Sequence, residues 1–258
     1  MTDHTESDVP ELEGKVAVVV GASRGLGRGV AEALSAAGAT VVAIGRDEAG
    51  LSELSAASPS LEVVVADATD PALAASVIQS RDPDVLAVIA GATPTLLPIH
   101  EQTWETFSEN WDVDVRLAFN WLGEALRKPL RPGSRVLLMS SGAAVMGSPL
   151  SGGYAGAKAT IRFMAAYGDE EARRAGLGIR VLAVLPRLTP ATGLGLPAVR
   201  AYAARQGVSE EQYVAKAGPP VTPESAGEAF LSLAAGDLDG DIAYMLTGAG
   251  LAAVPVPG

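Results

Sequence analysis

Gly21-Ala22-Ser23-Arg24-Gly25-Leu26-Gly27 is the stretch that decides the fold, because it joins a β-branched run at residues 15–20 to an Ala- and Leu-rich helical pattern at 26–37. Glycines allow the backbone to turn sharply and to approach a bound diphosphate closely. The start of the helix presents free N–H groups to such an anion. The turn therefore predicts a nucleotide site, with contacts from Gly21, Ser23, Arg24, Gly25, Leu26 and Gly27.

The strand–turn–helix pattern repeats along the chain. Further apolar, strand-like runs lie at residues 40–44, 61–65, 84–89, 135–140, 179–185 and 242–246. Helical patterns lie between them at about 71–80, 103–128, 154–175 and 223–235, and Asp47 can cap another one. Apolar strands that alternate with helices are typical of a parallel sheet covered on both faces. We predict a single α/β domain, a Rossmann-type doubly wound parallel sheet of about seven strands.

Composition and charge exclude several classes of function. The chain of 258 residues has no cysteine and two histidines, so we expect neither disulfides nor a metal site. A net charge of −11 argues against nucleic acid and anionic membranes as partners. No apolar run approaches the ~18–20 residues of a membrane span. We expect a cytoplasmic protein, with a mobile acidic tail at residues 1–13 and a domain at 14–258.

Residues 187–220 break the alternation of strands and helices. They follow a predicted strand, carry four prolines and include two short helical patterns at about 198–205 and 209–217. A long excursion from the carboxyl end of a parallel strand is typical of a substrate lid, because loops at that end form the ligand crevice. We predict a lid, and a plain surface insertion is the alternative.

The end of the second strand distinguishes between two nucleotide cofactors. An NAD site has an acidic residue there that binds the ribose hydroxyls. This chain has Gly45-Arg46 instead, and Arg24 in the glycine turn supplies a second guanidinium. Two guanidiniums suit a 2′-phosphate, so we predict NADP(H), with two solvated surface arginines as the alternative. Asp67, just after the third strand, is placed to contact the adenine or to cap the next helix.

Tyr154 and Lys158 form a candidate proton-transfer pair. They are four residues apart and lie on one face of a predicted helix, where an ammonium can lower the pKa of a phenol. Ser141, thirteen residues upstream, can reach the same substrate oxygen. The pair alone is a short motif, and the nucleotide turn supplies the context that it needs.

Together these elements resemble the short-chain dehydrogenase/reductase family, over residues 14 to about 251. The family's TGxxxGxG turn is matched, with Val20 in place of its threonine, by Gly21, Gly25 and Gly27. Its catalytic serine and YxxxK motif are matched, in order and spacing, by Ser141, Tyr154 and Lys158. Asp67 matches the aspartate after the third strand, and Thr247-Gly248 is similar to the family's C-terminal turn.

The resemblance implies a hydride-transfer enzyme. Tyr154 would donate its phenolic proton to the substrate oxygen while a nicotinamide delivers hydride to the carbon. Lys158 would bind the nicotinamide ribose and lower the pKa of Tyr154, and Ser141 would hydrogen-bond the same oxygen. Ser140 is excluded, because at the end of a strand its side chain points to the opposite face from that of Ser141.

Two departures from the family pattern surround this trio. The family's NNAG reads Val88-Ile89-Ala90-Gly91 here, so we expect apolar packing to replace the two asparagines. The family's catalytic asparagine, in the helix before the fifth strand, is Asp114 here. We expect its carboxylate to pair with Lys158 and to oppose the effect of that lysine on Tyr154. In the alternative, only the backbone carbonyl of Asp114 matters.

A third departure follows the sixth strand, where the family's Pro-Gly reads Pro186-Arg187. Arg187 would lie at the nicotinamide end of the crevice, facing the diphosphate, an acidic substrate group or solvent. Either Thr189 or Thr192 would contact the carboxamide. The remaining cofactor contacts that the resemblance implies are Asp67, Ala68, Ala90, Gly91, Tyr154, Lys158, Pro186 and Thr189.

Small and aliphatic side chains are expected at the substrate end: Thr93, Leu96, Ala143, Val145, Met146, Leu150 and Leu188. They favour a moderately apolar ketone or aldehyde, so we predict an NADP(H)-dependent carbonyl reductase with a small-molecule substrate. An oxoacyl-carrier-protein reductase is the alternative enzyme. It would need a basic rim from Arg162, Arg173 and Arg174, but Glu170 and Glu171 predict ion pairs there. A non-catalytic, nucleotide-binding regulatory protein is the other alternative.

The resemblance also implies a homo-oligomer, a tetramer or a dimer, packed through the long helices at 111–128 and 154–175. Alanines that would permit close approach of these helices are Ala155, Ala157, Ala159, Ala165 and Ala166.

Overall fold

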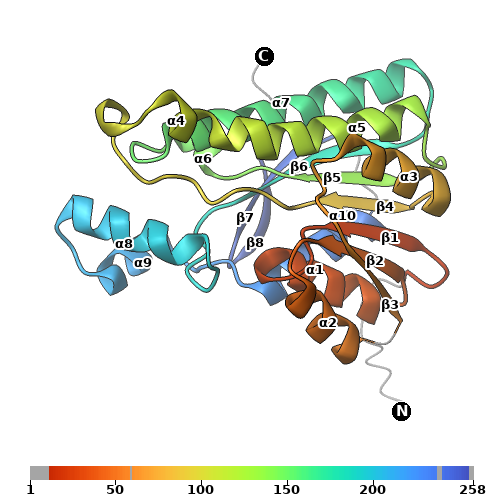
Figure 1. Ribbon diagram of the computed structural model, residues 1–258, viewed down its shortest axis with the longest axis horizontal. Coiled ribbons are helices and arrows are strands. Elements are labelled where there is room, and N and C mark those ends of the chain that lie inside the picture. Colours follow the sequence, from red (N-terminus) through yellow and green to blue (C-terminus); the bar gives the residue numbers. More distant parts are fainter. Residues whose placement is uncertain (1–11, 59, 237–239, 256–258) are drawn as a thin grey trace, which may run out of the picture.

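A computed structural model describes residues 12–58, 60–236 and 240–255 (Figure 1). One sheet of eight strands runs through the described part, in the order β3-β2-β1-β4-β5-β6-β7-β8. Neighbouring strands are parallel, except that β7 and β8 pair antiparallel. The strands are β1 (Val16–Val20), β2 (Thr40–Gly45), β3 (Leu61–Val65), β4 (Val85–Val88), β5 (Arg135–Met139), β6 (Arg180–Pro186), β7 (Ala243–Thr247) and β8 (Gly250–Ala253). The predicted doubly wound α/β fold is confirmed, and short β8 is added to it.

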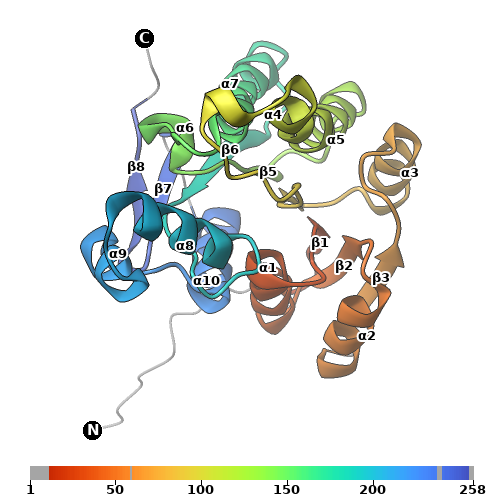
Figure 2. The same cartoon turned by 60° about the vertical axis from the view of Figure 1, so that its left-hand side comes forward.

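Helices cover both faces of the sheet (Figures 1 and 2). One layer contains α1 (Gly25–Ala36), α2 (Glu48–Ala57) and α10 (Pro223–Ala235), and the other contains α3 (Pro71–Arg81), α5 (Arg116–Arg127) and α7 (Gly152–Arg174). Each face has its own apolar core. Val19 packs with Leu34 of α1 on one side, and Val18 packs with Trp121 of α5 on the other. Successive β1 side chains thus enter opposite cores, which explains the continuous apolar run in the sequence.

The helix predicted at residues 103–128 has three parts. After the 3₁₀ turn η1 (Ile99–Glu101), α4 (Trp104–Asn110) leads into a π-helical turn, η2 (Trp111–Val115), and then into α5. A π turn holds one more residue than an α turn, and such turns are frequent at functional sites. Here the π turn contains Asp114, whose side chain is buried. The apolar spacing of the sequence predicts a helix but cannot distinguish this local change of winding.

Residues 187–220, predicted as a lid, contain α8 (Gly195–Gln206) and α9 (Glu210–Ala217). The two helices confirm the helical patterns predicted at 198–205 and 209–217. They form a block that stands out from the rest of the molecule, beyond the end of β6 (Figure 1). Short α6 (Ala143–Met146) lies between β5 and α7. The block is placed where a lid would be, and its role as a lid stays a prediction.

The predicted tail at residues 1–13 lies outside the described residues as far as residue 11. Its last two residues belong to the domain. Leu12 is buried, and its N–H donates to the carbonyl of Ala37 at 2.7 Å. A single apolar residue in an acidic stretch gave no signal of this contact. None of the helices in the described part of the chain is long and apolar enough to span a bilayer.

Candidate active site

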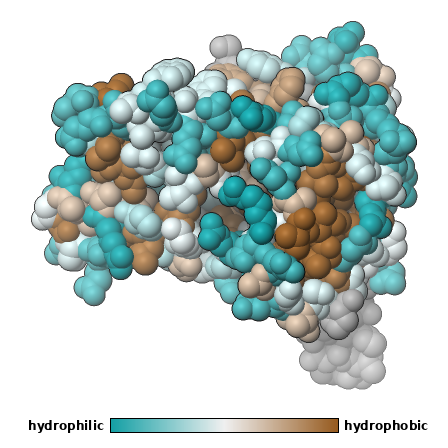
Figure 3. Space-filling view, viewed as in Figure 1, coloured by the Kyte–Doolittle hydropathy of each residue, from teal (hydrophilic) through white to brown (hydrophobic). Residues whose placement is uncertain are grey.

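A cavity of about 1040 Å³ opens at the carboxyl ends of β1, β4, β5 and β6. The surface is hollowed there, between the α8–α9 block and the rest of the molecule (Figure 3). It lies where the strand order reverses between β1 and β4, the usual ligand position in open α/β sheets. The predicted site residues that line it are Gly21, Ser23, Arg24, Gly25, Leu26, Gly27, Arg46, Ala90, Gly91, Asp114, Ser141, Tyr154, Lys158, Pro186, Arg187, Thr189 and Thr192.

Close packing explains the glycines of the turn after β1. Gly21 has φ +96°, and a Cβ there would lie 2.6 Å from the backbone N of Ala90. A Cβ on Gly27 would overlap the carbonyl oxygen of Gly21. Gly25 also has positive φ, in the left-handed region that favours glycine. The turn is therefore pressed against the end of β4 and against itself, and its backbone forms the cavity wall.

The N-terminus of α1 suits an anion. Arg24 is its N-cap residue but makes no side-chain capping bond, and the first turn of the helix contains no acidic residue. The first N–H groups of a helix have no partner within the helix. At this terminus they border the cavity together with Ser23 and Arg24. The donors and the positive end of the helix dipole fit a phosphate.

Two arginines at the same end form no ion pair with the described residues. Neither Arg24 nor Arg46 forms an ion pair with any residue that the structure describes, and both line the cavity. Asp67 lies outside the lining but within electrostatic range of Arg46. Two hydrogen bonds from Thr69, at 3.0 and 2.9 Å, lower the pKa of Asp67, and the charge of Arg46 lowers it further.

The predicted alternative role of Asp67, as the cap of the next helix, is wrong. The cap of α3 is Asp70, whose carboxylate accepts from the N–H of Ala72 at 2.9 Å. Ala68, also predicted to contact the cofactor, does not line the cavity either. It is buried, and its carbonyl accepts from the indole N–H of Trp121 at 3.0 Å.

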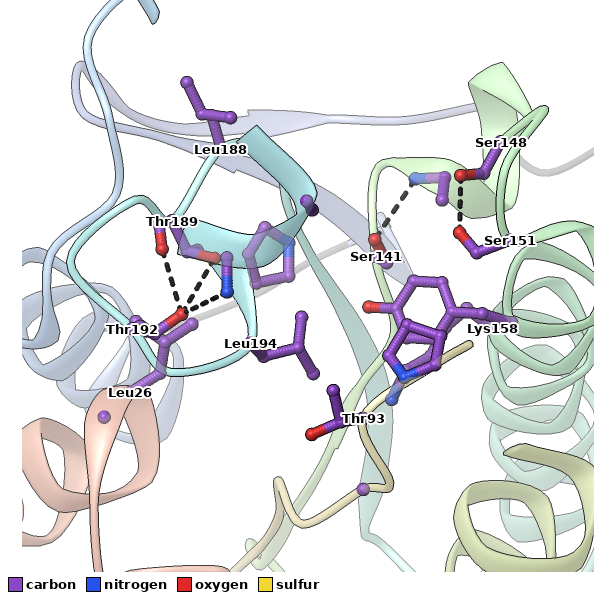
Figure 4. A pocket seen from close by; sticks show the side chains of 18 of the residues that line it. Leu26, Thr93, Ser141, Ser148, Ser151, Lys158, Leu188, Thr189, Thr192 and Leu194 are labelled. Atoms are coloured by element: carbon purple, nitrogen blue, oxygen red, sulfur yellow. Dashed lines mark hydrogen bonds between the residues drawn. The ribbon is translucent and has the colours of Figure 1, made fainter. Parts of the chain in front are cut away.

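The predicted catalytic side chains meet at the other end of the cavity. Lys158 and Ser141 lie on the same side of it (Figure 4). Tyr154 and Lys158 come from one face of α7, with the ammonium 5.6 Å from the centre of the phenol ring. The ammonium also donates to the carbonyl of Met139 at 3.2 Å, which ties α7 to the end of β5. Ser141, directly after β5, accepts from the N–H of Ala143 at 3.2 Å and keeps its hydroxyl proton available.

Ser140 has a different role from Ser141, as the strand alternation predicts. Its buried hydroxyl donates to the backbone carbonyl of Lys158 at 2.7 Å. This bond fixes the depth at which α7 packs on the sheet. The neighbouring serine is then left to face the cavity.

The expected ion pair between Asp114 and Lys158 is present. Their side chains are 3.1 Å apart, with exposed fractions of 1% and 5%. Burial lowers the pKa of Lys158, but the charges of Asp114 and Tyr154 and the hydrogen bond to Asp114 outweigh it, so the pKa is raised. The carboxylate itself, and not only its backbone, contacts the lysine.

Asp114 also holds the segment that replaces the family's NNAG. Its other oxygen accepts from the N–H of Ala92 at 2.7 Å. Asn110, one turn earlier, donates to the carbonyl of Ala92 at 2.9 Å. A Cβ on Gly91 would lie 2.8 Å from the carboxylate, so this glycine makes room for Asp114 as well as for a ligand. The expected apolar packing is present too, because Val88 and Ile89 pack into opposite cores.

The lining of the predicted substrate end was predicted only in part. Thr93, Leu96, Ala143, Met146 and Leu188 line it as expected. Val145 does not, because it points to solvent, and Leu150 does not, because it is buried. The polar residues Ser148, Tyr202, Arg205 and Tyr213 line it unpredicted. In the sequence these residues are marked only by their position in the predicted lid segment or beside a glycine. Such a position does not show whether a side chain points into the cavity.

Tyr202 joins the α8–α9 block to the start of α7. Its hydroxyl is hydrogen-bonded to Ser148 and accepts from the N–H of Leu150 at 3.1 Å. Ser148 in turn bonds Ser151 at 2.6 Å (Figure 4). Tyr202 also stacks on Tyr213 of α9, with ring centres 6.2 Å apart. The block is thus fastened to the segment that precedes Tyr154.

Comparison with known proteins places these features in a family. The family model of short chain dehydrogenases matches residues 15–201. The chain therefore belongs to the short-chain dehydrogenase family of oxidoreductases. The match includes the glycine turn and the residues Ser141, Tyr154 and Lys158, and it ends within α8.

Individual relatives and structures agree with this family. L-xylulose reductase of Mesocricetus auratus is 38% identical over 105 residues, which are 41% of this chain and 43% of that enzyme. The 3-oxoacyl-[acyl-carrier-protein] reductase of Escherichia coli is 33% identical over 67% of this chain and 73% of its own. The crystal structure of a putative NAD(P)-dependent gluconate 5-dehydrogenase from Beutenbergia cavernae, with NADP bound at low occupancy, superposes with a TM-score of 0.74 at 28% identity, covering 87% of this chain and 91% of that one. The first of these matches spans less than half of the relative's length.

Proposed function

We propose that this protein is an NADP(H)-dependent oxidoreductase that reduces the carbonyl group of a ketone or aldehyde to an alcohol. One observation carries the proposal. The glycine turn with Arg24 and Arg46, and the trio Ser141, Tyr154 and Lys158, line one continuous cavity. A dinucleotide bound along it would extend from the arginines to the trio.

The residues present fit this cofactor. The uncapped N-terminus of α1 supplies donors for the diphosphate. Arg24 and Arg46, with no anionic partner among the described residues beyond the nearby Asp67, suit the 2′-phosphate of NADP(H). Bound there, NADPH supplies a hydride for the substrate carbon. The NADP bound in the Beutenbergia cavernae structure supports this choice by analogy.

Three side chains would handle the proton. Tyr154 donates its phenolic proton to the carbonyl oxygen, and Ser141 donates a hydrogen bond to that oxygen. Lys158 stays charged because Asp114 holds its pKa high. Its ammonium stabilises the phenolate that Tyr154 becomes after the proton leaves.

The hydrogen bonds of the loop after β6 favour Thr189 over Thr192 as the carboxamide contact. The Thr192 hydroxyl donates to the carbonyl of Thr189 at 2.9 Å and accepts from the N–H of Gly195 at 2.9 Å. Its hydroxyl proton is therefore already used in a hydrogen bond within the turn that precedes α8. Thr189 retains its own hydroxyl proton for a ligand.

NADPH oxidation tests the proposal. The rate is followed at 340 nm with a panel of ketones, aldehydes and oxoacyl thioesters, for the native protein and for Tyr154→Phe. We expect turnover with at least one carbonyl class, and a loss of about 10³-fold or more in kcat for the variant because its proton donor is gone. Tyr167→Phe, an exposed tyrosine on the same helix, is the matched control. Unchanged turnover in Tyr154→Phe would contradict the mechanism.

The same assay separates the two alternatives. An oxoacyl-carrier-protein reductase is supported by the identity with the Escherichia coli enzyme. However, the basic rim that it would need is already engaged. Arg174 pairs with Glu171 at 2.6 Å, Arg173 pairs with Asp169 at 3.1 Å, and Arg162 bonds the carbonyl of Pro255. A non-catalytic regulatory protein would bind NADPH equally well with Tyr154→Phe and would turn over none of the panel.

We also propose a homo-oligomer packed through η2, α5 and α7, with a location in the cytoplasm. The alanines expected at this interface need correction. Ala155, Ala157 and Ala165 are buried in the protein's own core and cannot meet a partner. The large apolar side chains that these helices expose are instead Trp111, Phe119, Phe163 and Tyr167. Exposed aromatic side chains on these helices support association, which light scattering of the purified protein would measure.

A further inference from the structure

The charge of the cavity is opposite to that of the whole chain. The protein has a net charge of −11. The cavity lining holds one carboxylate, Asp114, and five cationic side chains, which are Arg24, Arg46, Lys158, Arg187 and Arg205. Such a contrast attracts anions and raises their association rate with the site.

Three of these cations have an assignment. Lys158 is neutralised by Asp114 at 3.1 Å. Arg24 and Arg46 lie at the dinucleotide end, where the proposed 2′-phosphate accounts for them. Arg187 and Arg205 remain, and neither forms an ion pair with a residue in the described part of the chain. Arg200, also on α8, differs because it pairs with Glu210 at 3.4 Å.

Arg187 lies beside the catalytic trio. It follows β6 directly, and its N–H donates to the carbonyl of Leu246 at 3.0 Å, which fixes its backbone. A Cβ on Gly142 would lie 3.3 Å from the Cγ of Arg187. Gly142 is adjacent to Ser141, so the arginine side chain leaves the sheet next to the catalytic serine. Its backbone is anchored, and the residue as a whole is exposed.

Arg187 also faces the α8–α9 block. Burial raises the pKa of Tyr213, and the charge of Arg187 opposes this shift, which places the guanidinium within electrostatic range of that phenol. Tyr213 stacks on Tyr202. Arg205 comes three residues after Tyr202 on α8, so the two side chains share one face of the helix. Arg187 and Arg205 therefore border the substrate end from the sheet and from the block.

We propose that Arg187 and Arg205 form an anion subsite, so that the substrate is a carbonyl compound with a carboxylate or a phosphate group. The subsite rests on the proposed reductase function and narrows its substrate class. A guanidinium binds either group through paired, charge-assisted hydrogen bonds. The expected substrate class therefore changes from a moderately apolar carbonyl compound to an anionic one. The aliphatic side chains then contact the carbon skeleton.

The chemical step balances without further reactants. The carbonyl carbon gains a hydride from NADPH, the C=O π bond breaks, and its electron pair takes the proton of Tyr154. The products are a hydroxy acid or hydroxy phosphate and NADP⁺. Tyr154 regains a proton from solvent, and the anionic group is unchanged.

Matched substrate pairs test the subsite. The pairs are 4-oxopentanoate with its methyl ester, and dihydroxyacetone phosphate with dihydroxyacetone. Each is measured for kcat/KM with NADPH, using the native protein and the variants Arg187→Gln, Arg205→Gln and Arg200→Gln. Binding of each compound to the protein–NADP⁺ complex is measured by calorimetry. The two pairs distinguish a carboxylate from a phosphate.

We expect the native protein to prefer the anion in at least one pair by about tenfold or more. Arg187→Gln and Arg205→Gln should each reduce kcat/KM and affinity for that anion by roughly 10–100-fold. The neutral member should change by less than about twofold, which shows that the variant is folded. Arg200→Gln should leave both members unchanged.

Equal use of the anionic and neutral members, or equal losses for both in the variants, would overturn the subsite. Selective binding of an anion without turnover would sustain the subsite but contradict the proposed reduction. Turnover of neutral carbonyls, with no anion bound or preferred, would support the proposed reduction and contradict the anion subsite. The two proposals therefore fail separately.

Discussion

The two ends of the cavity are built differently. The end proposed for the dinucleotide is formed largely by backbone, with the glycine turn pressed on Ala90 and the open N-terminus of α1 bordering the cavity. The substrate end is formed by side chains, from Ser141 and Tyr154 to the arginines and tyrosines of residues 187–213. A cavity wall made of tightly packed backbone accepts few residue types, chiefly glycine. A wall made of side chains can be built from many different residue types. The first end therefore has a strong motif in the sequence and the second does not.

The two ends also differ in how they are fastened. The glycine turn is part of the central sheet and its cores. The α8–α9 block is connected by the hydrogen bonds of Tyr202 and by a contact of Thr192 with the turn, where a Cβ on Gly25 would lie 3.6 Å away. Asp114 stands between the ends, because it holds both Ala92 and Lys158. Variants of these residues test whether the two ends of the cavity differ in this way. The largest effect on stability is expected at Asp114.

Asp114→Asn should lower the free energy of unfolding by about 3 kcal/mol, because it leaves the buried ammonium of Lys158 without an anion. In the native protein the pKa of Lys158 is raised above its ordinary value of 10.5, so the stabilisation is complete at lower pH and is lost as the pH rises through the raised value. In the variant, burial without the carboxylate lowers that pKa, and the deficit should shrink as the pH rises. Urea unfolding between pH 7 and 10 measures this.

At pH values where Lys158 of the variant is still protonated, the pH–rate limb that reports Tyr154 should move to lower pH, because an ammonium without a paired carboxylate favours the phenolate. Asp112→Asn is the matched control. It lies on the same π turn but is exposed and pairs with Arg116 at 3.6 Å. An Asp114→Asn profile identical to that of Asp112→Asn would remove the carboxylate from the mechanism.

Gly27→Ala should break the backbone-built end. Its Cβ would overlap the carbonyl of Gly21, so we expect a loss of about 2–3 kcal/mol in the free energy of unfolding and loss of measurable NADPH binding. Gly193→Ala, in the loop that also lines this cavity, has open space around its Cβ and should change stability by less than about 0.5 kcal/mol. Similar effects of the two substitutions on NADPH fluorescence titrations and melting curves would contradict the contrast.

Replacing the two arginines of the dinucleotide end, as Arg24→Ala with Arg46→Asp, should change cofactor choice without affecting the fold. We expect kcat/KM with NADPH to fall about 100-fold relative to NADH, because two charge-assisted contacts to the 2′-phosphate are lost. Arg28→Ala is the control, since that arginine of α1 is paired with Glu32 at 2.9 Å and does not line the cavity. A native protein that already prefers NADH would refute the assignment.

Tyr202→Phe should have the smallest effect. It removes the hydrogen bonds to Ser148 and Leu150 that fasten the α8–α9 block, at a cost of about 1 kcal/mol. We expect a several-fold rise in KM for the carbonyl substrate and faster amide exchange in α8, with KM for NADPH unchanged. Tyr213→Phe keeps the stacked pair and is the comparison variant. Equal shifts of both KM values would mean that the block closes over the whole cavity.

The sequence predicted the parts of the site that are fixed by backbone or by helical spacing. Gly21, Gly27 and the pair Tyr154 and Lys158 belong to this class. The partner of Lys158 was also predictable, because Asp114 lies in a helical stretch of known position. The π turn that buries Asp114 was not predictable, because a local change of helical winding does not alter the spacing of apolar residues in the sequence. Tyr202 and Arg205 could not be placed, because they depend on how a separate helical block packs across the cavity.

The strand order has a consequence for the growing chain. β1 to β4 are contiguous within residues 16–88 and pair only with one another, apart from β4, which also pairs with β5. The glycine turn can therefore be assembled on a four-stranded sheet once the first third of the protein has left the ribosome, while the rest is still being synthesised. Ser141, Tyr154 and Lys158 are synthesised later and join this sheet afterwards. Binding of the nucleotide and reactivity towards a substrate would then be acquired at different moments of biosynthesis.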